Sequence, residues 1–275
     1  MKVFCILGDQ RAYQLRSPEM FTRVLRRCGI KGAYVPFAVK PNDLGRAIDS
    51  LRVLGIAGAN VTLPYKEKAA AYMDVLSEGA NIIGAINTVV ISGSHLKGYN
   101  TNAIGFMDAL DEAGYSVEGK SALIFGTGGA AKSVAFILNW LRTDRIYVAG
   151  RDKEKARGIV SRFGGEVVSF ERLAAEPLPV DLMVNATAVS NPDESPQMHA
   201  LIKELDLPGC EFIVDLNYGR RDNFWQSMAG KLNIRFMDGL SSLAFQARRT
   251  LALWTKVQVP PQEFLSAQKQ IEVST

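Results

Sequence analysis

A glycine-rich turn between a strand-like run and a helix-like run constrains this chain more than any other feature. Residues 121–125 are a short apolar run, residues 126–131 read GTGGAA, and an apolar-faced segment follows to about residue 141. This is the GxGxxA order of a strand, a tight turn and a helix that together hold a dinucleotide pyrophosphate at the helix N-terminus. The pattern predicts a Rossmann-type sheet with a nucleotide site at Gly126, Gly128, Gly129 and Ala130.

The residues after the next expected strand bear on the choice of nucleotide. An acid at this strand tip binds the ribose 2′-hydroxyl of NAD, whereas a basic residue accommodates the 2′-phosphate of NADP. Here the strand runs into Gly150 and Arg151, with Lys155 close behind. An arginine can pair with a phosphate through two N–H groups. The sequence favours NADP, and NAD stays the alternative because Asp152 could turn towards a 2′-hydroxyl.

Strand-like and helix-like segments alternate along the whole chain, and its 275 residues fit two domains. We expect an α/β fold with an N-terminal α/β substrate domain and a C-terminal doubly wound Rossmann domain. The expected limits are residues 1–102 for the substrate domain, completed by helices at 240–275, and residues 103–239 for the nucleotide-binding domain.

The first hundred residues carry several local signals. Ser17 and Asn42 are expected to cap helices, and a further helix is expected from Pro64 to about residue 76. Pro36 suggests an edge or irregular position in its strand, and Gly93 suggests a hairpin turn. The tail after Pro260-Pro261 is expected to be loosely constrained.

Composition excludes several classes of protein. Hydrophobic residues make up 47% and the formal net charge is only +4, which does not favour nucleic acid as a partner. No apolar run approaches the ~20 residues of a membrane span. Three distant cysteines and two histidines show no metal-ligand spacing. We expect a cytoplasmic protein without a metal, monomeric or homodimeric, in which lysine or a carboxylate moves protons.

The stretch ANVTLPYK at residues 59–66 is the second chemically suggestive region. Strand alternation points Asn60 and Thr62 to one side, and Lys66 follows after Pro64. By themselves these residues fit either a polar cleft at a strand end or a plain strand terminus.

With this stretch included, the chain resembles the shikimate dehydrogenase family. The matching segments occur in the family's order: ANVTLPYK, GAINT at 84–88, GTGGAAKS, NAT at 185–187, Asp215 to Tyr218 as its DxxY region, and DGLSSLAFQA. The resemblance implies NADP-linked, reversible oxidation of a cyclohexene carboxylate, as in aromatic amino acid and chorismate biosynthesis, and catabolic members of the family share the same motifs.

The resemblance also implies site residues. Lys66 is the implied catalytic lysine, and Gly239 and Thr187 would lie near the nucleotide. The residues implied to bind substrate are Asn60, Thr62, Asn87, Tyr218 and Gln246. A lysine whose pKa is lowered by burial suits proton transfer during hydride transfer.

Two positions depart from the family pattern. The family loop reads HSxSP, and its two serines hold the substrate carboxylate. This chain retains Ser17, but Leu15 replaces the first serine, or Gln14 does if the loop has shifted, and Arg16 enters nearby. Arg16 either binds a carboxylate or faces solvent, and the substrate's identity depends on which.

The second departure lies in the catalytic pair. The family reads NTDxxG, and its aspartate partners the lysine, whereas this chain has Asn102 there. Asn102 can hydrogen-bond a hydroxyl or cap the helix expected from Ala103, but it carries no charge. The sequence leaves open an active dehydrogenase, one acting on quinate or aminoshikimate, and a weak or inactive member, natural or engineered, that binds nucleotide and metabolite.

Overall fold

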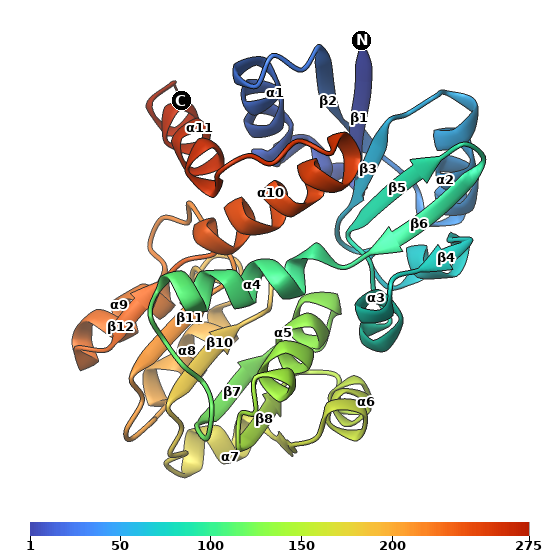
Figure 1. The fold of residues 1–275 in the computed structure, drawn as a ribbon. Helices are drawn as coiled ribbons and strands as arrows, with labels where there is room; N and C mark the ends of the chain where they lie inside the picture. Colours follow the sequence, from blue (N-terminus) through green and yellow to red (C-terminus); the bar gives the residue numbers. More distant parts are fainter. Residues whose placement is uncertain (275) are drawn as a thin grey trace. The chain divides into compact units, whose positions relative to one another are not determined.

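The computed structural model describes residues 1–274, which divide into two compact units. Unit 1 comprises Met1–Gly105 and the chain from Leu243 onward, and unit 2 comprises Phe106–Ser242. The chain passes from one unit to the other within two helices, α4 (Thr101–Glu112) and α10 (Leu240–Thr255) (Figure 1). The limits expected from the sequence fall slightly before these positions.

The sheet of unit 1 mixes parallel and antiparallel strands in the order β2-β1-β3-β5-β6-β4. The strands are β1 (Lys2–Gly8), β2 (Gly32–Ala38), β3 (Gly58–Val61), β4 (Val75–Leu76), β5 (Thr88–Ser92) and β6 (His95–Tyr99). β1 pairs in parallel with β2 and β3, while β5 runs antiparallel to both β3 and β6. Pro36 lies in the edge strand β2, and Gly93 lies in the turn of the β5–β6 hairpin with φ +58°, both as predicted.

Alternation along β1 explains why this sheet is covered on both faces. Phe4 and Ile6 join one core with Phe21 of α1 and Trp254 of α10, and Phe4 stacks on Trp254 at 4.9 Å. Cys5 and Leu7 join the opposite core with the buried residues of α2. In addition to α10, unit 1 contains the helices α1 (Ser17–Arg27), α2 (Leu44–Val53), α3 (Glu78–Ile83) and α11 (Pro261–Ser274).

Two expectations about the chain's course in unit 1 are wrong. Residues 64–76 form no α-helix: the short 3-10 turn Lys68–Tyr72 is followed by β4. The cause is hydrogen bonding to the edge of β6, where the backbone N–H of Asp74 donates to Leu96 and that of Ser77 to Gly98. The tail after Pro260-Pro261 is helix α11, which lies beside α1 (Figure 1) and buries Phe264 in the core.

Two predicted helix caps are also wrong. Arg16 occupies the cap position of α1 without a side-chain cap bond, and Ser17 is the first helical residue. Asn42 lies in the 3-10 turn Pro41–Asp43, and α2 begins only at Leu44.

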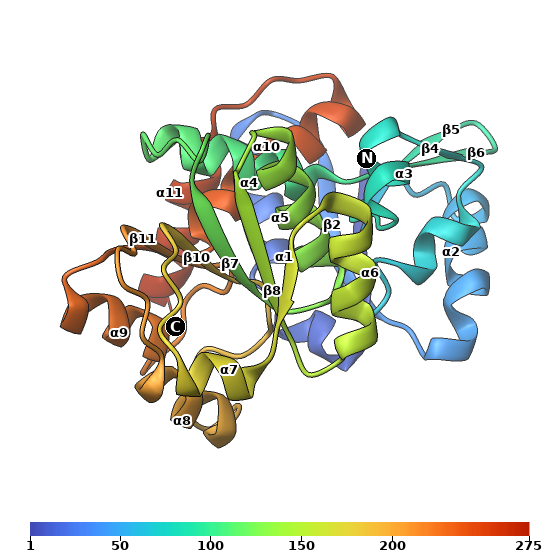
Figure 2. The same ribbon diagram turned by 90° about the horizontal axis from the view of Figure 1, so that it is seen from below.

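Unit 2 is a parallel, doubly wound sheet, as predicted, with the order β12-β11-β10-β7-β8-β9. Figure 2 labels its central strands β11, β10, β7 and β8. Its strands are β7 (Ser121–Phe125), β8 (Arg145–Ala149), β9 (Glu166–Val168), β10 (Leu182–Asn185), β11 (Phe212–Asp215) and β12 (Arg235–Met237). In addition to most of α4, unit 2 contains the helices α5 (Gly129–Trp140), α6 (Lys153–Phe163), α7 (Phe170–Ala175), α8 (Pro196–Glu204) and α9 (Phe224–Leu232).

The strand order of unit 2 reverses between β7 and β10. From β7 the chain proceeds outward to β8 and β9, and it then returns to the other side of β7 to form β10. The carboxyl ends of the strands at such a reversal are where open α/β sheets bind ligands. Within residues 1–274, no helix combines the length and the apolar character needed to span a membrane.

Candidate functional site

Strand register gathers the polar residues of unit 1 at one edge of its sheet. Asn60 of β3 lies opposite Thr88 of β5, and Thr88 lies opposite Tyr99 of β6. β3 and β6 therefore run in the same direction and end at the same level. The residues just beyond these ends, including Thr62 and Thr101, consequently meet the start of β5.

Asn87 is the centre of a buried hydrogen-bond network at this edge. Its Oδ1 accepts the backbone N–H of Thr101 at 2.7 Å. Its Nδ2 lies 2.9 Å from Asn102 Oδ1, 3.0 Å from Gln246 Oε1 and 2.9 Å from Thr101 Oγ1. Asn87 is 4% exposed, so the network is shielded from water and holds Asn102 and Gln246 in place.

Asn60 belongs to the wall of this site. Its Oδ1 accepts the Tyr34 hydroxyl at 2.8 Å, and its Nδ2 donates to Asn87 O at 2.8 Å and Thr88 Oγ1 at 3.1 Å. The side chain is 5% exposed and both of its N–H bonds are used. These contacts do not fit the expectation that Asn60 contacts substrate, and they assign it to holding β3 against β5.

Other predicted groups keep hydrogen-bonding capacity for a ligand. Within residues 1–274, the Thr62 hydroxyl and the amide nitrogens of Asn102 and Gln246 make no hydrogen bond to protein. None of these atoms is buried without a partner, so each is open to solvent or ligand. The structure thus groups Thr62, Asn87, Asn102 and Gln246 in one place.

Lys66 follows directly on this strand end. Its carbonyl accepts the backbone N–H of Ile86 at 2.8 Å, which ties its loop to the segment that carries Asn87. Desolvation by burial lowers the pKa of its ammonium from 10.5 to about 8. In the part of the chain that the structure describes, no carboxylate pairs with this ammonium. An uncompensated lysine of this kind can hold or release a proton near neutral pH.

Asn102 does not cap α4, contrary to the capping interpretation. The helix begins at Thr101, and the Ala103 N–H donates to Asn100 Oδ1 at 3.1 Å. Asn100 is in turn fixed by donating to Ala85 O at 3.0 Å. Because Asn100 performs the capping, the Asn102 side chain is available to the site.

The candidate residues of the loop after β1, Gln14, Leu15 and Ser17, differ in how far they are buried. Leu15 is partly buried against the core that contains Phe4 and Phe21, so it contributes packing. Gln14 is exposed at the end of the 3-10 turn Gln10–Gln14. Ser17 is 7% exposed at the first position of α1.

The glycine-rich turn of unit 2 has the contacts expected of a phosphate-binding loop. Gly126 adopts φ +118°, and a Cβ there would lie 2.9 Å from the backbone of Ala186. A Cβ on Gly128 would meet nothing within 4 Å, so the backbone at the start of α5 is open to a ligand. Gly129 is buried at the first position of α5, with Ala130 next to it. The turn is held firmly on one side and open on the other.

Thr187 and Gly239 lie in loops that follow β10 and β12, which flank β11 in the same sheet. The Thr187 hydroxyl donates to Asn185 Oδ1 at 2.7 Å, which closes a tight turn after β10. Gly239 follows β12, and a Cβ there would lie 2.1 Å from Leu216 O. Tyr218 is part of unit 2, where it is partly buried after β11.

The tip of β8 resolves the role of Asp152. Its carboxylate caps α6 by accepting the Lys155 N–H at 3.0 Å, and it also pairs with the Lys155 ammonium at 3.2 Å. The backbone hydrogen bond is the main cause of the lowered pKa of Asp152. Arg151 is exposed, and among the described residues it makes no ion pair. Arg151 therefore keeps its charge available to a ligand beside the turn, while Asp152 and Lys155 occupy each other.

Buried Asp215 is a residue that pattern reasoning undervalued. Its oxygens accept from Asn185 at 2.8 Å, Ser190 at 2.6 Å, Asn223 at 2.7 Å and the backbone and side chain of Asn217, both at 3.0 Å. It is 0% exposed. The DxxY match had marked its position, but the donors are spread over 39 residues of sequence and show no common pattern. This network fixes the loops that carry Thr187 and Tyr218.

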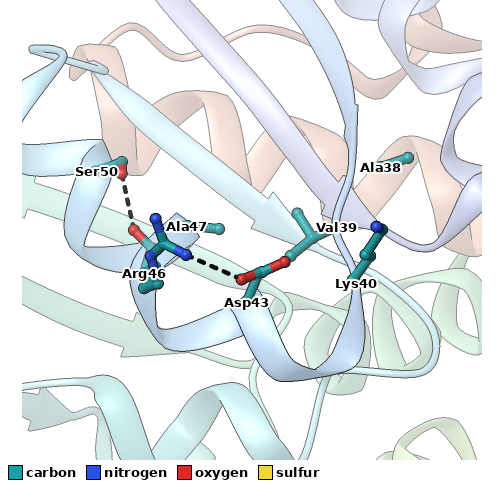
Figure 3. A pocket seen from close by; sticks show the side chains of 7 residues that line it. All are labelled: Ala38, Val39, Lys40, Asp43, Arg46, Ala47 and Ser50. Carbon is teal, nitrogen blue, oxygen red and sulfur yellow. Dashed lines mark hydrogen bonds and ion pairs between the residues drawn. The ribbon is translucent and has the colours of Figure 1, made fainter.

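A shallow hollow of about 430 Å³ lies elsewhere on unit 1, between the end of β2 and α2 (Figure 3). In it Arg46 pairs with Asp43 at 3.3 Å, and the Ser50 hydroxyl donates to Arg46 O at 2.8 Å. Because Arg46 and Asp43 partner each other on an exposed surface, we do not assign the functional site to it.

Comparison with protein families places two matches along the chain. Residues 9–89 match the shikimate dehydrogenase substrate binding domain, and residues 109–221 match the shikimate / quinate 5-dehydrogenase family.

Individual relatives agree with these matches over nearly the full length. The NADP(+) shikimate dehydrogenase of Caldanaerobacter subterraneus subsp. tengcongensis is 33% identical, with 92% of this chain and 91% of the relative covered. The corresponding protein of Pyrococcus abyssi is 35% identical, with 94% and 93% covered. A Thermus thermophilus shikimate 5-dehydrogenase, solved with NADP(H) and shikimate, is 32% identical, with a TM-score of 0.84 over 98% of this chain and 99% of that one.

Proposed function

Because the chain belongs to the shikimate dehydrogenase family, we propose that it transfers hydride reversibly between NADP(H) and the hydroxyl or ketone carbon of shikimate and 3-dehydroshikimate, or of a close analogue. The observation that carries the proposal is the likeness to NADP-linked relatives over nearly the whole chain, together with the open polar groups at one sheet edge of unit 1. The reaction is NADPH, a proton and a ketone giving NADP+ and an alcohol.

The residues of unit 2 fit NADP. Gly126 lets the turn pass close to Ala186, and Gly128 leaves backbone at the start of α5 open to a pyrophosphate. Arg151, which has no ion pair within residues 1–274, offers its guanidinium to a 2′-phosphate. Asp152 is engaged as a helix cap, which removes the acid that would favour NAD. When bound, this cofactor supplies or accepts the hydride. Gly128, Gly129, Ala130, Thr187 and Gly239 are proposed to line its site.

The substrate is proposed to lie against the strand ends of unit 1. Thr62, Asn102 and Gln246 offer open hydrogen-bonding groups to its oxygens, and Asn87 orients two of them. Ser17 is the remaining hydroxyl proposed for the carboxylate, since Leu15 packs into the core. Tyr218 and Gln14 are proposed to border the substrate from their loops.

Lys66 is proposed to move the proton. In ketone reduction its ammonium gives a proton to the carbonyl oxygen as the carbon receives hydride, and in alcohol oxidation the neutral amine takes that proton back. With a pKa of about 8, both forms are accessible near neutral pH.

Asn102 is proposed to take the place of the family's aspartate as a neutral orienting residue. It still accepts a hydrogen bond from Asn87, as a carboxylate oxygen would, but it neither stabilises a charged lysine nor relays a proton. We expect slower turnover than in an aspartate-bearing variant, with the fold unchanged.

Nicotinamide absorbance with NADP+ and shikimate, quinate or an aminoshikimate tests the proposal. Shikimate should support NADP+ reduction, Lys66→Met should abolish it, and Asn102→Asp should increase it. If no substrate is turned over at high enzyme concentration although NADP binds, the proposed reaction is wrong and the chain is a binding protein.

A further inference from the structure

A single backbone group fixes the direction of the hydrogen bonds around Asn87. The Thr101 backbone N–H can only donate, and it points at Asn87 Oδ1 at 2.7 Å. The amide of Asn87 cannot be turned over without placing two donors face to face. Its Nδ2 must therefore be the atom that faces Asn102 and Gln246.

The orientation of the Asn87 amide determines the orientation of the two neighbouring amides. Three acceptors lie within reach of the two N–H bonds of Asn87 Nδ2: Asn102 Oδ1 at 2.9 Å, Gln246 Oε1 at 3.0 Å and Thr101 Oγ1 at 2.9 Å. If either neighbouring amide turned its NH2 group towards Nδ2, two donors would face each other. The Thr101 hydroxyl is a further donor within 3.2 Å of Gln246 Oε1. With their oxygens facing Asn87, Asn102 and Gln246 must direct their NH2 groups elsewhere.

The outward NH2 groups are accessible. Across the described residues, neither Asn102 Nδ2 nor Gln246 Nε2 has a protein partner, and neither is among the buried side-chain atoms that lack one. Both oxygens contact the same nitrogen, so the two amides lie next to each other. A ligand oxygen bound at either NH2 group meets an N–H donor.

We propose that Asn102 and Gln246 form a donor-only surface, and that this surface makes the site select the ketone over the alcohol form of its substrate. The inference rests on the proposed function, since it names which of the two reaction partners the site prefers.

The preference follows from the proton that the two forms do or do not carry. A ketone oxygen has lone pairs only and is satisfied by N–H donors. An alcohol also carries an O–H, which finds no acceptor on these two amides. An aspartate at position 102 would accept that proton, so the amide shifts the selectivity towards the ketone. The Thr62 hydroxyl can donate or accept, and it does not discriminate between the forms.

Binding measurements without turnover test this inference. Calorimetry would give the Kd of 3-dehydroshikimate with NADP+ present and of shikimate with NADPH present, since neither pair can react. The ratio of alcohol Kd to ketone Kd is compared between the wild type and Asn102→Asp. The Asp oxygen can still accept from Asn87, and a carboxylate in the first turn of α4 favours the helix.

The ratio should fall at least about tenfold in Asn102→Asp, because the alcohol regains a hydrogen-bond acceptor. Gln246→Glu makes the same donor-to-acceptor change from another element and should lower the ratio in the same direction, with thermal unfolding as the check on folding. If both ligands bind and neither variant changes the ratio, the inference is overturned while the proposed function stands. If neither ligand binds the wild type, the proposed function fails, and this inference fails with it.

Discussion

Replacing Lys66 with methionine should reveal how much the buried ammonium destabilises the fold. Methionine keeps an unbranched apolar stem and removes the charge. The folded pKa of Lys66 is about 8, against 10.5 in the unfolded chain. At about 1.36 kcal/mol per pKa unit, this difference corresponds to about 3 kcal/mol at most.

The sign of the pH dependence follows from the lowered pKa. Between pH 8 and 10.5 the unfolded chain binds more protons than the folded one, so stability rises with pH over this window. Below pH 8 the wild type should therefore be less stable than Lys66→Met by up to about 3 kcal/mol, and this gap should close as the pH approaches 10.5.

Urea unfolding of both proteins at a series of pH values from 7 to about 10.5 measures this gap. Subtracting the two curves cancels every group that the proteins share. A difference that does not vary with pH would show that Lys66 has the same pKa in both states, and the desolvation argument would be refuted.

Three further predictions concern the reaction, the cofactor and the fold. The kcat for ketone reduction should fall as the pH rises through about 8, and the kcat for alcohol oxidation should rise. The reason is that Lys66 must be protonated for reduction and neutral for oxidation. A pH–rate profile in each direction measures this. Arg151→Ala should weaken NADP binding about 10- to 100-fold in calorimetry and leave the affinity for NAD nearly unchanged. The control Arg157→Ala, which removes an exposed partner of Glu154, should change the affinity for neither nucleotide. Gly239→Ala should destabilise the protein by about 3 kcal/mol in urea unfolding, because its Cβ would lie 2.1 Å from Leu216 O. The matched control is Gly230→Ala in α9, where a Cβ meets nothing within 4 Å, and it should not destabilise the protein.

The strands and the nucleotide turn could be predicted because their signals are local. Local sequence alone indicates a strand at 121–125, a turn at the glycines after it and a helix at α5. The sheet of unit 2 follows from repetition of this strand–turn–helix pattern along the chain. The hairpin at Gly93 is equally local.

Long-range pairing explains the errors. Residues 64–76 look helical alone, but the edge of β6 takes the backbone N–H groups of Asp74 and Ser77. The cap of α4 could not be assigned between Asn100 and Asn102 from spacing alone. It is decided by the contact of Asn100 with Ala85 and that of Asn102 with Asn87, which come from other elements.

The candidate site was only partly predictable for the same reason. Sequence resemblance marked Asn87, Asn102 and Gln246, but not that Gln246, from a distant helix, shares one donor with Asn102. It also marked Asn60 without showing that Tyr34 and Asn87 already use its amide. Which polar groups remain open to a ligand depends on the folded network.

Direct detection of hydride transfer tests the central claim most closely. The protein is incubated with 3-dehydroshikimate and NADPH that carries deuterium on the transferred position of nicotinamide C4, and the product is examined by NMR. We predict deuterium on the carbinol carbon of shikimate with the wild type, and none with Lys66→Met. Recovery of unchanged ketone from the wild type, with NADPH bound, would contradict the account.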